Sequence, residues 1–277
     1  MIILKFGGTS VGSAENIKKV VEIITKIEAP KIIVLSAVTG TTNSLIEIGS
    51  HARNNSKELA FKSLQLLNDS YQELINELYA TPIYKEKAID FVSSVFENIG
   101  KDIENEERRN IENMIVAQGE IISTNLMQLY LEESSISSSL VSAFEFMEID
   151  ENSEPKINVI TEKLIPLLNK EPLQNTWITQ GFICMNSSGE IANLQRGGSD
   201  YTASLIGAGI KATEIQIWTD IDGMHNNDPR YVENTFSIEE ISFDEAAELA
   251  YFGAKILYPQ SLIPAKENNI PVLLKNT

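Results

Sequence analysis

The sequence predicts an α/β protein, a three-layer αβα sandwich in which helices cover both faces of a mostly parallel central sheet. Short apolar runs typical of buried strands alternate with longer segments whose apolar residues recur every three or four positions. The 277 residues are 43% hydrophobic and 22% charged, which is enough apolar material for a sizeable core. Residues 56–131 have helical spacing throughout, and we expect them to form a helical insertion.

The first predicted strand, residues 2–6, is apolar except for Lys5. It runs into a glycine-rich turn that begins with Gly7 and Gly8, and helical spacing follows over residues 14–26. A strand, a glycine turn and a helix in this order present backbone N–H groups to phosphate. We therefore interpret Lys5 as a cation beside a phosphate rather than an edge lysine that reaches solvent. The turn matches neither the P-loop nor the dinucleotide fingerprint.

The second predicted strand, residues 31–35, leads into a hydroxyl-rich loop that contains Ser36 and Thr42. Two interpretations stay open at this stage. The hydroxyls contact a polar substrate at the carboxyl end of the sheet, or they cap a helix and form turns. Within the helical region, Glu120 interrupts an apolar pattern, and a carboxylate in such a place is usually paired or functional.

A further glycine-containing segment runs from Arg196 to Asp200, just before an apolar helical run. Two adjacent glycines let the backbone approach a ligand closely, and the free N–H groups of a helix start favour anions. The Arg196 guanidinium suits a carboxylate or a phosphate. The alternative is a glycine turn that caps the helix, with a solvated arginine. The other expected elements are strands at 140–146, 176–185 (with a glycine break), 191–194, 214–218 and 270–275, and helices at 157–168, 201–211 and 243–252.

Charge and composition exclude several classes of function. The 22 Lys+Arg against 39 Asp+Glu give a formal charge of -17, which repels nucleic acid and anionic membranes. Cys184 is the only cysteine, so no intrachain disulfide forms, and two histidines make a histidine metal site improbable. We expect no leader and no membrane span, and we expect a cytoplasmic protein that acts on small molecules.

In a parallel sheet the loops at the carboxyl ends of the strands meet. We expect four loops to converge there. They contain, in order, Lys5 with Gly7 and Gly8; Ser36 with Thr42; Arg196 to Asp200; and the segment from Thr219 and Asp220 to Arg230. Together they offer cations, glycine amides and helix N-termini, without a nucleophile–base pair. This inventory favours phosphoryl transfer, in which a protein mainly positions reactants and neutralises charge.

Eight motifs in this order carry a resemblance to a known family: Lys5-Phe6-Gly7-Gly8-Thr9-Ser10-Val11, Ser36-Ala37 with Thr42-Asn43, Gly119-Glu120, Gln180-Gly181-Phe182, Arg196-Gly197-Gly198-Ser199-Asp200-Tyr201, Trp218-Thr219-Asp220, Asp228-Pro229-Arg230 and Phe252-Gly253-Ala254-Lys255. With them the chain closely resembles the aspartokinases of the amino acid kinase family. The resemblance implies the amino acid kinase fold and one catalytic domain over residues 1–277. Within it, an aspartate-binding lobe would cover about 1–195 and a nucleotide-binding lobe about 196–277.

The resemblance implies ATP-dependent phosphorylation of the L-aspartate side-chain carboxylate to 4-phospho-L-aspartate, the first step toward lysine, threonine and methionine. The catalytic residues would be Lys5 and Asp200. Aspartate would be bound by Ser36, Thr42, Glu120, Phe182, Arg196 and Ser199. The nucleotide would be bound by Lys5, Gly7, Gly8, Thr219, Asp220, His225, Arg230 and Lys255. Magnesium would be carried mainly by the ATP phosphates, with no metal ligand from the protein.

The sequence departs from the family pattern in three places. His225 stands where many relatives carry tyrosine, with Asn226-Asn227 in place of a small hydroxyl pair, and Tyr258 replaces a histidine. The sequence stops at Thr277, whereas full aspartokinases continue into regulatory ACT modules. We expect an isolated catalytic domain with absent or altered feedback inhibition. Its full-length parent would assemble through those modules, and a homodimer is the assembly still open to this chain.

Two other functions are weighed against this one. A sister kinase acting on acetylglutamate, glutamate or UMP would share the fold, but the motifs around Lys5 and Arg196 speak against it. A non-catalytic sensor of amino acids or nucleotides is disfavoured because Lys5, Arg196 and Asp200 are all present.

Overall fold

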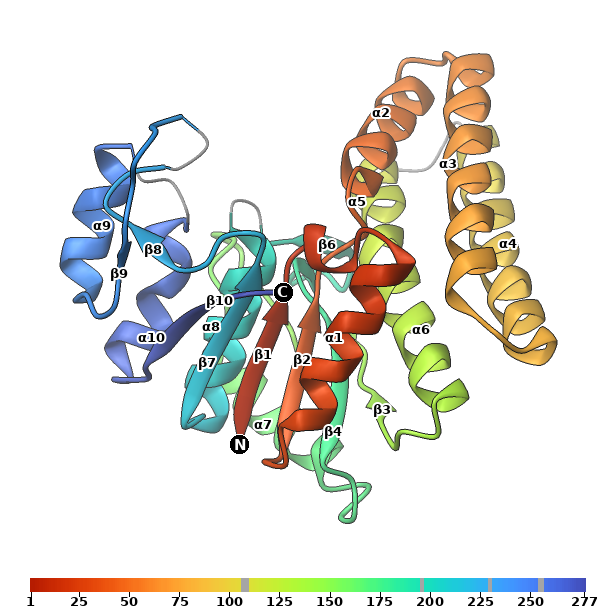
Figure 1. Cartoon of the computed structure of the whole chain (residues 1–277). Helices are drawn as coiled ribbons and strands as arrows, with labels where there is room; N and C mark the ends of the chain where they lie inside the picture. The colour runs from red at the N-terminus through yellow and green to blue at the C-terminus, as the bar shows by residue number, and fades with distance from the viewer. Residues whose placement is uncertain (106–109, 195–196, 229–230, 254–256) are drawn as a thin grey trace.

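The computed structural model describes residues 1–105, 110–194, 197–228, 231–253 and 257–277. At its centre is a six-stranded sheet in the order β10-β7-β1-β2-β4-β3, in which every neighbouring pair is parallel (Figure 1). The predicted α/β fold with a parallel sheet is confirmed. The strands are β1 (Ile2–Phe6), β2 (Lys31–Leu35), β3 (Ser139–Leu140), β4 (Thr176–Gln180), β7 (Glu214–Thr219) and β10 (Val272–Asn276).

Helices cover both faces of the sheet, because successive side chains of a buried strand point to opposite sides. Leu4 and Phe6 of β1 belong to the core shared with α1 and the helical insertion. Ile3 belongs to the other core, and by the same alternation Lys5 lies on that side. The helices next to the sheet are α1 (Ala14–Lys26) on the first face, and α7 (Ile157–Leu168), α8 (Gly198–Ile210) and α10 (Ile263–Glu267) on the second.

The helical insertion predicted for residues 56–131 is confirmed. Two long helices project from the sheet as a separate arm, and the last helix returns to the sheet beside β4 (Figure 1). Tyr71 and Phe96 contact each other between the two long helices, with ring centroids 5.9 Å apart. The helices of the insertion are α3 (Lys57–Leu78), α4 (Pro82–Glu104), α5 (Ile111–Val116) and α6 (Gln118–Glu133), and α2 (Thr41–Arg53) precedes them.

One strand prediction is wrong, and a second needs correction because its two halves lie in different sheets. The strand expected at 140–146 stops at Leu140, and a 3-10 helix, η2 (Ala143–Glu145), follows. The Gln180 side chain accepts the Ala143 N–H at 2.8 Å, so this amide bonds a side chain instead of a neighbouring strand.

The strand expected at 176–185 is divided between two sheets. β4 ends at Gln180, and β5 (Ile183–Met185) pairs antiparallel with β6 (Ile191–Asn193) in a separate ribbon. Between them Phe182 has a φ of 66°, and this left-handed residue turns the chain out of the central sheet.

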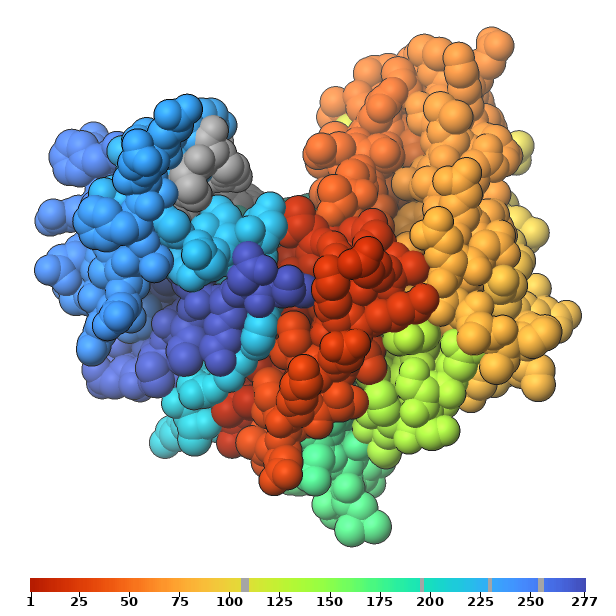
Figure 2. Space-filling model, viewed as in Figure 1, coloured from red at the N-terminus to blue at the C-terminus, as the bar shows by residue number. Residues whose placement is uncertain are grey.

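A small lobe lies beyond β7. It contains the hairpin of β8 (Met224–His225) and β9 (Ser237–Ile238), followed by α9 (Phe243–Tyr251), which begins with a capping box. Figure 2 shows the surface hollowed between this lobe and α2 and α3, with the N-terminal segment at the floor. The lobes expected on either side of residue 195 share one continuous sheet, because β7 pairs with β1 and β10 pairs with β7. None of the helices formed by the described residues has the length and apolar character needed to cross a bilayer.

Candidate active site

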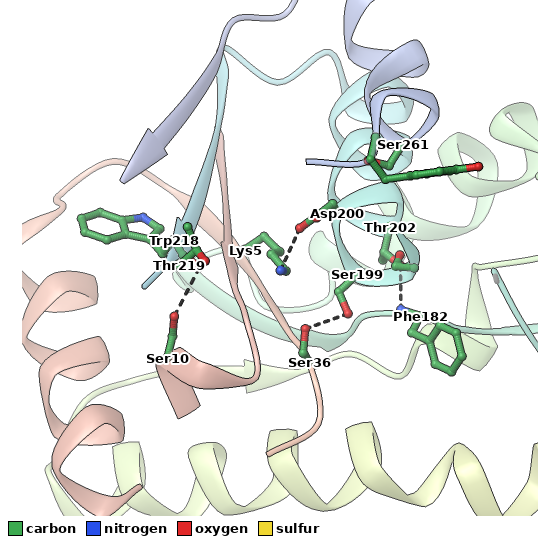
Figure 3. Close-up of polar contacts among 12 residues, drawn as sticks. Lys5, Ser10, Ser36, Phe182, Ser199, Asp200, Thr202, Trp218, Thr219 and Ser261 are labelled. Atoms are coloured by element: carbon green, nitrogen blue, oxygen red, sulfur yellow. Dashed lines mark hydrogen bonds and ion pairs between the residues drawn. The ribbon is translucent and has the colours of Figure 1, made fainter. Parts of the chain in front are cut away.

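An ion pair lies at the centre of the candidate site. Lys5 is only 8% exposed, and its Nζ lies 2.8 Å from Oδ1 of Asp200 in the first turn of α8 (Figure 3). The contact follows from the fold, because β1 runs between β2 and β7 with its odd side chains facing α8. The structure therefore brings together two expected site residues that are 195 positions apart. They meet at the carboxyl ends of the strands, where α/β sheets bind ligands.

Two serines join the second and third expected loops. The Ser36 hydroxyl, just after β2, donates to the Ser199 hydroxyl at 2.9 Å (Figure 3). Thr42 lies half-buried in the first turn of α2. The N-cap residue of this helix is Gly40, so no side chain caps it. The helix-cap interpretation is thus wrong for both Ser36 and Thr42. The Ser36 hydroxyl lies at the strand end, against the first turn of α8.

Phe182 is held against the start of α8. Its N–H donates to the Thr202 hydroxyl at 2.9 Å, and its backbone is left-handed. A Cβ on Gly198 would lie 2.2 Å from the Phe182 ring, and a Cβ on Gly181 would lie 2.5 Å from Ser199. Glycine is thus required at both positions for the close approach. The sequence analysis did not assign a role to Thr202. The only feature that could have indicated one is its hydroxyl group, one turn into the predicted helix.

Gly198→Ala is expected to destabilise the protein by about 1–3 kcal/mol, because the new methyl group must displace the Phe182 ring. Gly100→Ala in α4 is the matched control. Its Cβ would meet one Phe61 ring atom at 3.4 Å, so a gain of up to about 1 kcal/mol from helix propensity is expected. Urea unfolding of both variants measures the difference, and equal stabilities would contradict this packing.

Glu120 on α6 is a buried carboxylate with one oxygen free. It is 3% exposed, and its Oε1 accepts the Ala37 N–H at 3.2 Å. Its Oε2 is buried and has no hydrogen-bond partner within the described residues. Burial raises the pKa of Glu120 to about 8, against the opposing effect of the Ala37 amide. The arrangement fits an ammonium ligand, which would supply both the charge and the donor that Oε2 lacks.

A buried hydroxyl pair lies near this carboxylate. The hydroxyls of Thr41 and Tyr71 are 2.9 Å apart, and Thr41 packs against Gly119, the residue before Glu120. Burial, assisted by the charge of Glu120, raises the pKa of Tyr71, so its hydroxyl stays protonated. Thr41 and Tyr71 come from α2 and α3, and the sequence offered no signal that they lie near Glu120.

The glycine turn after β1 offers fewer free amides than expected. The Gly7 N–H donates to the Trp218 carbonyl at 3.1 Å, so it is already bonded within the protein. The Gly8 N–H has no partner among the described residues, and a Cβ on Gly8 would lie 2.9 Å from the Ala37 carbonyl. Gly8 therefore supplies the amide that is open to an anion. At Gly7 the lack of a side chain leaves space beside Lys5, whose Nζ is 3.5 Å from an added Cβ.

The residues expected to bind a nucleotide are partly engaged with each other. The Thr219 hydroxyl donates to the Asp220 carboxylate at 2.9 Å. Both ring nitrogens of His225 are taken, Nε2 by Asp222 at 2.6 Å and Nδ1 by Thr235 at 2.9 Å. The bond from His225 lowers the pKa of Asp222. His225 thus ties the loop after β7 to the segment before β9.

Three expected site residues, Arg196, Arg230 and Lys255, lie outside the described residues. Among the residues that the structure describes, no group of three or more His, Cys, Asp or Glu side chains is placed to hold a metal ion.

Comparison with known proteins identifies relatives along the whole chain. The family model described as the amino acid kinase family matches residues 1–276. Aspartokinase 1, chloroplastic, of Arabidopsis thaliana is 34% identical over 290 residues, and lysine-sensitive aspartokinase 3 of Escherichia coli (strain K12) is 31% identical over 284. Each alignment covers 99% of this chain, but only 50% and 61% of the relatives, respectively. The chain therefore spans about half to three-fifths of their length.

A solved structure agrees with the sequence relatives. E. coli aspartokinase III in complex with aspartate and ADP has a TM-score of 0.87 and 31% sequence identity. The match covers 100% of this chain and 62% of that one. With the family match over nearly every residue and the same sheet architecture, the chain belongs to the amino acid kinase family.

Proposed function

We propose that this chain is the catalytic domain of an aspartokinase, which phosphorylates the side-chain carboxylate of L-aspartate with ATP. The single observation that carries the proposal is the buried Lys5–Asp200 pair at the strand ends, beside a glycine turn with an open amide. The names of the relatives, and the aspartate and ADP bound by the E. coli enzyme, favour this substrate pair over those of sister kinases. The proposal includes the role given below to each site residue of this chain.

The residues around Lys5 fit a phosphate group. The Gly8 amide has no partner among the described residues, no side chain fits at that position, and a buried ammonium lies beside the preceding glycine, Gly7. When bound, ATP supplies the transferable phosphoryl group, with Mg²⁺ carried mainly on its phosphates. Thr219, Asp220, Arg230 and Lys255 would hold the rest of the nucleotide. His225 would support this site by fixing its loop, since both of its ring nitrogens are already bonded.

Lys5 would neutralise negative charge between the two anionic substrates. Because water screens a buried ammonium only weakly, Lys5 would stabilise this negative charge more strongly than a surface lysine would. Asp200 would hold the Lys5 ammonium in place at 2.8 Å. Ser199, at the start of α8, and Ser36 would contact the substrate nearby, with Arg196 on a carboxylate. A carboxylate is already nucleophilic, so the site requires no strong general base.

Glu120 would bind the amino group of aspartate. The free protein holds this carboxyl largely protonated at neutral pH, because burial raises its pKa to about 8. An ammonium placed against Oε2 would stabilise the ionised form, so amino acid binding would release a proton from Glu120. Phe182 and Thr42 would form the wall of this pocket. In this scheme most aspartate contacts come from residues of about 1–195, and most nucleotide contacts from residues of about 196–277. The exceptions are Lys5 and Gly8 on the nucleotide phosphates, and Arg196 and Ser199 on aspartate.

The test is a hydroxylamine-trapping assay, which captures acyl phosphates. The purified chain is incubated with ATP, Mg²⁺ and either aspartate, glutamate or acetylglutamate, with ATP omitted as the control. We expect hydroxamate only with aspartate. Product with another acid would support a sister kinase, and a chain that binds nucleotide without product from any acid would support a sensor.

A further inference from the structure

Ser10 connects the glycine turn to two other strands. Its side chain is buried, with 2% of the residue exposed, and its hydroxyl donates to the Trp218 carbonyl at 3.3 Å (Figure 3). The same carbonyl accepts the Gly7 N–H at 3.1 Å. One peptide group at the end of β7 therefore anchors the turn after β1 at two points.

Thr277, which follows β10, completes this connection. Its N–H donates to the Thr219 carbonyl at 3.0 Å, which extends the pairing of β10 with β7. Its hydroxyl lies 2.8 Å from that of Ser10. Ser10 has one hydroxyl hydrogen, so when it donates to Trp218 the bond between the two hydroxyls takes its hydrogen from Thr277. The hydroxyls thus connect β10, through the glycine turn, to β7.

A second set of contacts follows the same route. The Lys275 ammonium lies 5.4 Å from the centroid of the Trp218 ring, which stacks on Phe6 at 5.8 Å. Phe6 is the last residue before Gly7. The end of β10 is therefore coupled to the turn through a row of side chains as well as through hydroxyls.

We propose that Ser10 and Thr277 are positioning residues for the phosphate-binding turn, so that the placement of the end of β10 sets the affinity for the nucleotide. The inference rests on the proposed kinase function. Neither hydroxyl needs to touch the substrate, because they act by fixing Gly8 and Lys5 relative to β7. A displacement of about 1 Å in a positioning group is enough to weaken a site strongly. A force that pulls β10 away from β7 would lower nucleotide affinity while the pocket around Glu120 stays intact.

The experiment measures MgADP affinity by titration calorimetry and the KM for aspartate in the hydroxamate assay. Thr277→Val, which removes the hydroxyl at nearly constant volume, is expected to weaken MgADP about 5- to 30-fold and leave the aspartate KM unchanged. Thr277→Ser should restore affinity to within about twofold. Ser10→Ala should weaken MgADP at least as much, and the double variant no further, because both residues belong to one hydrogen-bond chain.

Thr213→Val is the matched control. Its hydroxyl donates to the Met1 carbonyl at 3.1 Å at the opposite end of the sheet, so no change in MgADP affinity is expected. Unchanged affinity in Thr277→Val, or an equal loss of MgADP and aspartate binding, would overturn the positioning role. A wild-type chain that binds no MgADP would refute both this role and the kinase function. Binding without hydroxamate would refute the kinase function alone, with the calorimetric comparison still decisive for Ser10 and Thr277.

Discussion

The Lys5→Met variant is expected to stay folded and to lose turnover by at least about a hundredfold. Methionine matches the length of the lysine stem, so the buried position next to α8 stays filled. What disappears is the ammonium that lies 2.8 Å from Asp200 and beside Gly7 of the glycine turn. In the proposed mechanism no other described side chain replaces its charge between the two anions. The measurement is kcat in the hydroxamate assay, with circular dichroism to verify folding.

Lys31→Met is the matched control for this experiment. Lys31 is also buried, at 5% exposure, and lies at the start of β2, at the opposite end of the sheet. Its ammonium donates to the Ile27 carbonyl at 2.6 Å, away from the site. We expect it to lose stability and to keep its turnover. Near-normal turnover of Lys5→Met would refute the role given to Lys5.

Glu120→Gln is expected to change both the pH dependence of stability and the affinity for aspartate. Burial raises the pKa of Glu120 in the folded chain from its ordinary value of 4.5 to about 8. Between these values the folded state binds more protons than the unfolded state, so wild-type stability falls as pH rises, by up to about 1.4 kcal/mol per pH unit from this group. Glutamine does not ionise, so the variant should lose this slope and be the more stable protein at pH 8. Urea unfolding from pH 5 to pH 9 measures both curves.

The same substitution should raise the KM for aspartate at least about 30-fold, because the ammonium loses its buried counter-charge. In the wild type, the KM for aspartate should fall as pH rises toward 8, where Glu120 ionises without help from the substrate. Glu133→Gln, on the same helix, is the control. Hydrogen bonds from Thr81 and Ala80 lower the pKa of Glu133 despite its partial burial. The stability that the ionised Glu133 contributes to the fold is therefore lost as pH falls. An identical pH slope in wild type and Glu120→Gln would contradict a buried Glu120 carboxyl.

Periodicity alone predicted most of the elements. The predicted helices at 14–26 and 157–168 coincide with α1 and α7, and the predicted strands at 2–6 and 31–35 coincide with β1 and β2. Each of these segments contains several apolar residues at one regular spacing, so the pattern that predicts the element lies entirely within the segment. The end of the strand expected at 140–146 could not be predicted from a local pattern. It depends on Gln180 of β4, whose side chain accepts the Ala143 N–H.

The sequence by itself determined which residues are available at the strand ends: a lysine inside an apolar strand, glycines in the turns, and an acid within an apolar helix. Only the tertiary structure decided what each group is free to do. It placed Lys5 on Asp200, engaged the Gly7 amide with Trp218, and occupied both nitrogens of His225. The physical reason is that charge state and hydrogen bonding depend on burial and on partners far along the chain. A spacing pattern records only which face of its own element a residue occupies.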